Sequence, residues 1–187
     1  MGMLSSNQIA DLGLAAVGEE VQISDRCSIY GASAISIGSH VRIDDFAIIT
    51  ARAPVIIGSY VHISAFAFIS GQFGIDIGDF CNVGIRVTLL STNDDFSGEW
   101  LPGAVIPLEL RSPTGAPVVF DRHVTVGSHT VVLPGVRLAE GVAVGALSLV
   151  KSSLPDWGIY AGIPARRLRE RKRNAETLSR QLMHDSR

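Results

Sequence analysis

The sequence predicts an all-β fold in which the chain winds as a coil with three flat sides. Two observations predict it: an apolar residue recurs every six residues over much of the chain, and a small residue follows four positions later. An α-helix repeats near 3.6 residues and a strand near 2, so a period of six fits neither alone. It is typical of a solenoid in which each side of the coil is a short strand and each corner is a turn.

The repeat is regular over two long stretches. In the first, an aliphatic residue opens each coil at intervals of twenty, at Val17, Ile37, Ile57 and Ile77. In the second, the interval is a strict six, at Phe120, Val126, Val132, Leu138, Val144 and Val150. We expect the small fifth positions to point inward as well: Val21, Cys27, Ser33, Val41, Ala47, Val61, Ala67, Cys81 and Val87. The two cysteines therefore belong to the core, about three coils apart, which is too far for a disulfide.

Composition excludes several classes of protein. The chain has 187 residues, 47% of them apolar, which suits one domain with a continuous core, and the 6% aromatic share suits a narrow prism. A net charge of -2 argues against a nucleic-acid-binding surface over the whole protein. The start lacks a basic region leading into an apolar run, and no apolar stretch approaches ~20 residues, so we expect no secretory signal, no membrane span and a cytoplasmic location.

Three parts are expected along the chain. Ser5 or Ser6 can cap a short helix that Gly13 ends. The register then breaks in the middle of the stack in a polar, Pro- and Gly-rich loop, which we expect to be functional. Pro164 is well placed to start a charged, weakly amphipathic helix. The division is an N-terminal cap, the solenoid with its loop, and a C-terminal helix and tail: residues 1–16, 17–163 with loop 91–117, and 164–187.

Motifs in this chain resemble the hexapeptide-repeat acyltransferases. The last third is similar to sugar and xenobiotic acetyltransferases, through Gly127-Ser128-His129, Val144-Gly145-Ala146 and Ala161-Gly162-Ile163-Pro164-Ala165-Arg166. Other segments resemble the dTDP-4-amino-4,6-dideoxy-glucose acyltransferases more narrowly: Val41-Arg42-Ile43-Asp44-Asp45-Phe46, Tyr60-Val61-His62-Ile63, Asp94-Asp95-Phe96-Ser97-Gly98-Glu99 and Trp157-Gly158-Ile159-Tyr160. The resemblance implies a left-handed parallel β-helix and a homotrimer with acetyl-CoA in the groove between prisms. It also implies N-acetylation of a nucleotide-linked amino sugar for surface polysaccharide such as O-antigen or lipopolysaccharide.

The main departure from the sugar O-acetyltransferases falls at Asp94. Their base is a His at the start of the long loop. A hydroxyl needs such a base, whereas an amine attacks once it is neutral, and water or a carboxylate can take its proton. Asp94 therefore favours an amino-sugar acceptor, as the proton acceptor or by holding the sugar ammonium; the alternative is a loop-start cap. His62, expected to point outward near Arg42 and Asn82, is the second candidate base.

Other polar residues near these positions have weaker assignments. Ser64 stands where the O-acetyltransferases carry a substrate-binding Asn. Asp95 and Glu99 are candidate acceptors for sugar hydroxyls, or else solvated loop residues. His123 and His129 occupy equivalent positions one repeat apart, as in hexapeptide carbonic anhydrases, but a metal there needs a third His from a neighbouring subunit, so no metal is expected.

The resemblance also implies a coenzyme A site. It assigns backbone contacts with pantetheine and charge-assisted contacts with the 3′-phosphate to six residues: Ser128, Ala146, Lys151, Ser152, Arg166 and Arg169. Most of the basic run at 166–173 is equally expected to be a solvated surface.

Three functions thus remain open. The leading hypothesis is an acetyl-CoA-dependent N-acetyltransferase acting on a nucleotide-linked amino sugar. The first alternative is a sugar O-acetyltransferase of the galactoside or maltose type, and the second is a metal-binding β-helix without acyl transfer.

Overall fold

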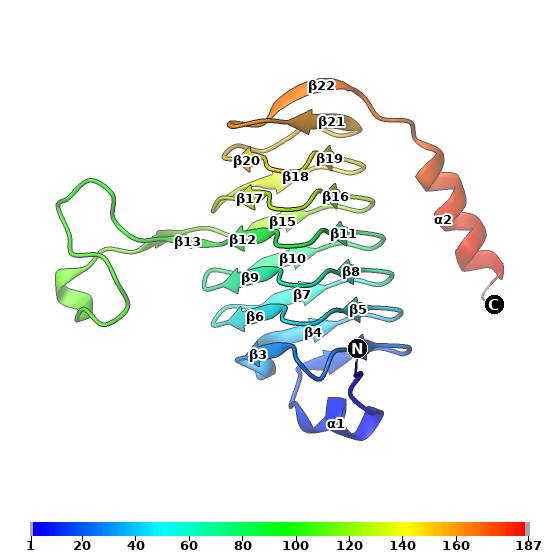
Figure 1. Cartoon of the computed structure of the whole chain (residues 1–187), viewed down its shortest axis with the longest axis horizontal. Helices are drawn as coiled ribbons and strands as arrows, with labels where there is room; N and C mark the ends of the chain where they lie inside the picture. The colour runs from blue at the N-terminus through cyan, green and yellow to red at the C-terminus, as the bar shows by residue number, and fades with distance from the viewer. Residues whose placement is uncertain (1, 186–187) are drawn as a thin grey trace.

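The computed structural model describes residues 2–185, which form a parallel β-helix of stacked three-sided coils (Figure 1). The N-terminal helix lies at one end of the stack and the last strand at the other, while the C-terminal helix runs back along one side (Figure 1). Three sheets form the faces of the prism, and their strands pair in parallel except for the final pair. The predicted fold class, a three-sided β-solenoid, is confirmed.

Each coil contributes one strand to each face. The first face contains β1 (Ala16–Val17), β4 (Ile35–Ile37), β7 (Val55–Ile57), β10 (Ile75–Ile77), β15 (Val118–Phe120) and β18 (Arg137–Leu138). The second contains β2 (Gln22–Ile23), β5 (Arg42–Ile43), β8 (His62–Ile63), β11 (Asn82–Val83), β16 (Thr125–Val126), β19 (Ala143–Val144), β21 (Gly158–Ala161) and β22 (Arg166–Glu170). The third contains β3 (Ser28–Tyr30), β6 (Ile48–Ala51), β9 (Phe68–Gly71), β12 (Thr88–Leu90), β17 (Val131–Val132) and β20 (Leu149–Val150).

Aliphatic side chains stack in columns inside the prism, because parallel pairing aligns equivalent residues of successive coils. On the second face Ile43 pairs in register with Ile23 and Ile63, and all three are fully buried. Burying one such side chain stabilises the fold by about 1.5–3 kcal/mol. From the second coil onward the predicted inward positions are buried: Ile37, Val41, Ala47, Ile57, Val61, Ala67, Ile77, Cys81 and Val87.

The first coil departs from the predicted pattern. Val17 is 43% exposed, and Val21 and Cys27 are only half-buried, because no further coil lies beneath them. Ser33 is exposed on a 3-10 turn, η1 (Ala32–Ala34), so its predicted inward position was wrong. The chain turns at this point instead of extending the strand. Both cysteines of the chain are free thiols, as predicted.

Helix α1 (Ser6–Asp11) covers the open end of this first coil (Figure 1). Ser5 is its N-cap and forms a capping box with Gln8, in which each side chain bonds the other residue's backbone N–H. Ile9 is the buried residue of the helix and packs against the core. The short helix predicted with a Ser cap is confirmed.

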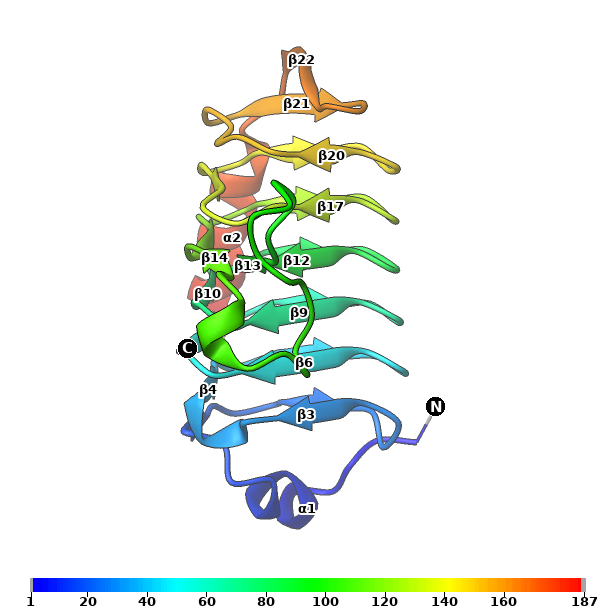
Figure 2. The same ribbon diagram turned by 90° about the vertical axis from the view of Figure 1, so that its left-hand side faces the viewer.

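The long loop leaves the stack at the corner between the third and first faces, which we call the third corner. It projects sideways on a narrow antiparallel ribbon of β13 (Thr92–Asn93) and β14 (Thr114–Gly115), with a 3-10 turn, η2 (Leu108–Leu110), beyond it (Figures 1 and 2). The stack itself continues without a gap, because β15 pairs with β10 as the next strand of the first face. The predicted break in register therefore marks an insertion in an unbroken prism.

The C-terminal segment corrects one prediction. Pro164 does not start a helix: residues 166–170 form β22, which pairs antiparallel with β21 and closes the upper end of the second face. The last strand of a solenoid exposes unpaired backbone groups, and a returning strand satisfies them. Helix α2 (Asn174–Asp185) begins later and runs alongside the corner between the first and second faces, the first corner (Figure 1).

A ladder of stacked rings lines the first corner. Its rings belong to His40, Tyr60, Phe80, His123 and Trp157. The first three pairs are stacked with centroids 4.6 to 5.2 Å apart, and Trp157 is tilted against His123 at 6.2 Å. All five residues have positive φ, a conformation that side chains other than glycine adopt with some strain, and ring stacking offsets that strain. Helix α2 is tied to the ladder where Ser179 Oγ lies 3.4 Å from His123 Nε2. Arg171, in the segment that leads into the helix, donates to the His123 carbonyl at 2.7 Å.

His123 should make the stability of this corner depend on pH. Burial and the charge of Arg122 lower the pKa of His123 below its usual value, with a further contribution from Arg171, and these outweigh the opposing effects of Glu140 and Glu176. The folded state therefore binds this proton less readily than the unfolded state, so protonation favours unfolding. We expect the free energy of unfolding to fall as pH drops below about 6.5.

Urea unfolding from about pH 8 to about pH 5 measures this dependence. His123→Phe keeps a ring in the ladder and removes the titrating group, so its free energy of unfolding should depend less on pH than that of the wild type. Identical pH dependence in both proteins would contradict this assignment.

Candidate active site

The two candidate bases lie on different edges of the prism. His62 is on β8 in the second face, whereas Asp94 directly follows β13, where the ribbon opens into the loop. The body of the prism separates these two edges. One chain therefore does not bring His62 and Asp94 together.

Asp94 is exposed at the start of the loop. Its Oδ2 accepts a hydrogen bond from the backbone N–H of Gly103 at 3.1 Å, so its carboxylate ties two parts of the loop together. This contact corresponds to the capping role weighed for Asp94. It still leaves the carboxylate on the solvent side of the ribbon, where a ligand can reach it.

Asp95 is occupied by the loop itself. Its two carboxylate oxygens accept hydrogen bonds from the hydroxyl and N–H of Ser97 and from the N–H groups of Gly98 and Trp100. The bond from the Ser97 hydroxyl, followed by those from the backbone, lowers the pKa of Asp95. The structure thus gives Asp95 a role in loop shape. Glu99 lies beside it and is exposed.

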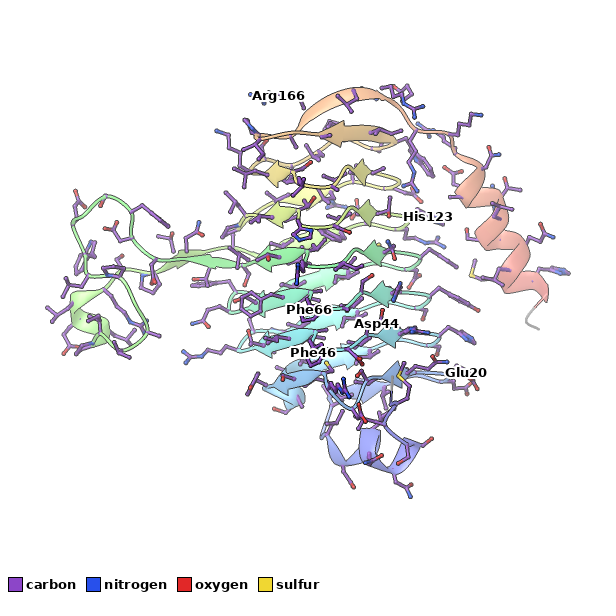
Figure 3. The ribbon with its side chains drawn as sticks, viewed as in Figure 1. Glu20, Asp44, Phe46, Phe66, His123 and Arg166 are labelled. Carbon is purple, nitrogen blue, oxygen red and sulfur yellow. The ribbon has the colours of Figure 1, made fainter. Side chains whose placement is uncertain are left out.

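His62 belongs to a polar triad on the second face. Its Nε2 lies 2.8 Å from Asp44 Oδ2, and Arg42 Nε donates to Asp44 Oδ1, also at 2.8 Å. Parallel pairing of β5, β8 and β11 places His62 between Arg42 and Asn82, as predicted. Figure 3 labels Asp44 on this face.

Asp44 was missed as a site residue by sequence reasoning. It is only 8% exposed, and burial raises the pKa of its carboxyl, but the hydrogen bonds and charges of Arg42 and His62 outweigh burial and hold the pKa below its usual range. One signal was present: Asp44 follows the inward residue of its strand, where later coils carry a small residue such as Ser64 or Gly84. A buried carboxylate at such a place needs cationic partners.

The corner between the second and third faces, the second corner, carries part of the predicted cofactor site. Ser128 and Ala146 follow β16 and β19 on successive coils, and the N–H of Leu147 bonds the carbonyl of Ser128 at 2.9 Å. A Cβ on Gly127 would lie 2.6 Å from the Ala146 nitrogen, so glycine permits this close approach of the two coils. Arg166 continues the column, because it pairs with Ala161 at the end of β21 (Figure 3).

The remaining predicted residues do not join this column within one chain. Lys151 and Ser152 are exposed after β20, at the third corner, and Arg169 is exposed farther along β22, opposite Ile159. Ser64 lies below the column but is only 7% exposed. The sequence thus predicted residues that the fold distributes over two edges of the prism.

The histidines considered for a metal site are also apart. His123 is buried in the ring ladder at the first corner, whereas His129 is exposed at the second. Among residues 2–185 no three His, Cys, Asp or Glu side chains gather closely enough to hold a metal ion. Within the same residues, no helix combines the length and apolar character needed to cross a membrane.

Known proteins share this architecture and much of this sequence. No protein-family model matches the chain. A dTDP-4-amino-4,6-dideoxy-D-glucose acyltransferase of Escherichia coli is 38% identical over 174 residues, which covers 92% of this chain and 91% of that protein. AntD, an N-acyltransferase from Bacillus cereus solved with dTDP and 3-hydroxybutyryl-CoA, superposes with a TM-score of 0.95 at 40% identity, over 100% of this chain and 99% of its own.

More distant structures share the fold alone. A hexapeptide-repeat-containing acetyltransferase from Vibrio cholerae, solved with acetyl-CoA, has a TM-score of 0.61 at 19% identity, over 89% of this chain and 78% of its own. The prism, the projecting loop and these similarities define an acyltransferase. The chain belongs to the hexapeptide-repeat acyltransferases, within the group of the dTDP-4-amino-4,6-dideoxyglucose acyltransferases.

Proposed function

We propose that this enzyme transfers an acyl group from a coenzyme A thioester to the C4 amine of dTDP-4-amino-4,6-dideoxyglucose. The observation that carries the proposal is the exposed carboxylate of Asp94 at the base of the loop, in place of a histidine. The fold supports it, because AntD, whose variant has been solved with dTDP-4-amino-4,6-dideoxyglucose and coenzyme A, covers 98% of this chain with a TM-score of 0.95.

In this reaction the sugar arrives with its amine protonated and must lose one proton before attack. Asp94 pairs with the ammonium and accepts that proton or passes it to water. The neutral nitrogen then forms a bond to the thioester carbonyl, and the carbon–sulfur bond breaks. The nitrogen loses its second proton as the departing sulfur gains one, so an amide and a free thiol result.

A complete site needs more than one copy of the chain. Apolar side chains that are exposed along the second corner suit a buried contact between copies: Phe46, Phe66, Ile85 and Leu147. We propose a homotrimer in which the loop of one prism reaches the second face of the next, so that Asp94 meets the column of Ser128 and Ala146. Lys151 and Ser152 of the third corner then face the same groove. Light scattering should give three times the chain mass.

Acetyl-CoA is the donor we propose for the enzyme, and 3-hydroxybutyryl-CoA is the comparison donor because AntD was solved with it. We assign backbone contacts with pantetheine to Ser128 and Ala146, and contacts with the 3′-phosphate to Arg166 and Arg169. We propose that the enzyme works in the cytoplasm, in the synthesis of surface polysaccharide.

One observation favours a second candidate function, O-acylation of a sugar hydroxyl. His62 is held through Nε2 by Asp44, so its Nδ1 faces away from the carboxylate and can act as a base. A hydroxyl acceptor needs such a base, whereas an amine does not.

A thiol-release assay separates the two functions. We expect rapid turnover of acetyl-CoA with dTDP-4-amino-4,6-dideoxyglucose and at least about 100-fold slower turnover with the sugar that carries a hydroxyl at C4, because that hydroxyl lacks its base. Comparable turnover with both sugars would favour O-acylation. Failure to bind coenzyme A would contradict both candidates.

A further inference from the structure

We propose that Arg42 and His62, both oriented by the buried carboxylate of Asp44, bind the diphosphate of the nucleotide sugar. This inference rests on the proposed function, and it assigns a part of the acceptor that neither Asp94 nor the cofactor column contacts.

The triad holds two basic side chains in fixed positions. Asp44 lies almost fully inside the prism wall, and its two oxygens each hold one partner at 2.8 Å. The side chains of Arg42 and His62 remain 48% and 42% exposed on the second face. Asp44 thus fixes the orientation of a guanidinium and an imidazole on neighbouring coils. The guanidinium binds phosphate through charge-assisted hydrogen bonds in planar, two-pronged geometry. The imidazole donates to phosphate through Nδ1–H in its protonated form, because Asp44 holds Nε2.

Folding alone does not call for a charge at position 44. Other coils place Ser64, Gly84 or Gly127 at the equivalent point, and a carboxylate loses hydration when it is buried there. A buried ion cluster often adds no stability over apolar residues of the same volume. The triad is therefore better explained by what Arg42 and His62 bind than by a contribution to folding.

Register places the triad at the right height for a diphosphate. The strands β11 and β12 belong to one coil, and the loop carrying Asp94 leaves that coil. His62 lies one coil below it and Arg42 two coils below, which is roughly 5 and 10 Å along the axis. The cofactor column of Ser128 and Ala146 lies above it. An acceptor whose amine meets the thioester near Asp94 extends its nucleotide downward, so its diphosphate reaches the level of Arg42 and His62.

The second face offers a polar surface along this proposed path of the nucleotide sugar. Residues equivalent to Arg42 on the coils above are His62, Asn82 and Thr125, aligned by parallel pairing, and the Asn82 amide lies 3.5 Å from the Thr125 hydroxyl. A sugar lying along this column finds donors and acceptors from the triad up to the level of the cofactor.

Titration calorimetry with dTDP, dTMP, thymidine and coenzyme A tests the inference. We expect Arg42→Gln to raise the Kd for dTDP about tenfold or more, with a smaller change for dTMP and none for thymidine or coenzyme A. His62→Gln should act in the same direction. Lys172→Gln is the control: it removes one positive charge from an exposed position between β22 and α2, outside the second face and the third corner, and should bind dTDP like the wild type.

Each outcome bears on the assignment. Wild-type affinity for dTDP in Arg42→Gln, with unchanged thermal unfolding, overturns the diphosphate site, and so does an equal loss of thymidine binding. UDP distinguishes this inference from the proposed function: if the wild type binds UDP and not dTDP, the proposed acceptor is wrong. The diphosphate site is then supported if Arg42→Gln weakens UDP binding and overturned if it does not. Binding of neither nucleotide overturns both.

Discussion

Asp94→Asn is expected to lower kcat about 100-fold, the size of effect usual for loss of a general base. Asparagine has the same shape and can still accept the hydrogen bond that Gly103 donates to Asp94, so the loop should keep its conformation. It cannot take a proton or pair with an ammonium. The substitution therefore separates the chemical role of the carboxylate from its capping role. Steady-state kinetics with acetyl-CoA and the amino sugar measure the effect.

Two further variants make the result decisive. Glu109→Gln removes a carboxylate from an exposed position of the same loop, on η2, and should turn over at close to the wild-type rate. Asp94→Ala removes the charge and the loop contact together. If Asp94→Asn retains wild-type turnover while Asp94→Ala loses it, Asp94 is a cap and the amine loses its proton to water or to another group. The KM for acetyl-CoA should stay unchanged in Asp94→Asn, because none of the contacts proposed for coenzyme A is made by the Asp94 side chain.

The fold could be predicted because every coil repeats the same local information. A period of six fixes which residues face inward, and parallel pairing then aligns each position with its equivalent above and below. For that reason His62 could be placed between Arg42 and Asn82 without a structure. The short N-terminal helix was predictable as well, because Ser5 caps it through contacts with near neighbours.

Features that depend on long-range geometry were not predictable in this way. Residues 166–170 have the composition of a charged helix, but they form a strand because they pair with the open edge of β21. Asp44 and His62 are eighteen residues apart and meet only because consecutive coils stack. The separation of Asp94 from the cofactor column likewise follows from which corner each occupies, and no spacing in the sequence encodes it.

The ring ladder was not predicted from the sequence either. Its geometry depends on Gly141, which leaves room for the Trp157 indole. Gly141 occupies the corner between His123 and Trp157, as its N–H bonds the carbonyl of Arg122 in the coil below. Its φ is +68°, and a Cβ there would lie 2.4 Å from two atoms of the Trp157 indole. Trp157 is 1% exposed and has no room to move aside. The missing side chain is what lets the indole close the ladder over His123.

Gly141→Ala should therefore destabilise the protein by about 3 kcal/mol, the sum of strain at positive φ and overpacking. The melting temperature should fall by roughly 6–12 °C, as scanning calorimetry can measure. Gly13→Ala is the matched control, because Gly13 has a φ of +69° with no atom within 4 Å of the added Cβ. It should lose only the strain contribution, about 1 kcal/mol. Equal losses in the two variants would mean that the indole tolerates the methyl group and that Gly141 serves only the turn. A larger loss at Gly141 would show that the Trp157 indole, packed against His123, leaves no room for the methyl group.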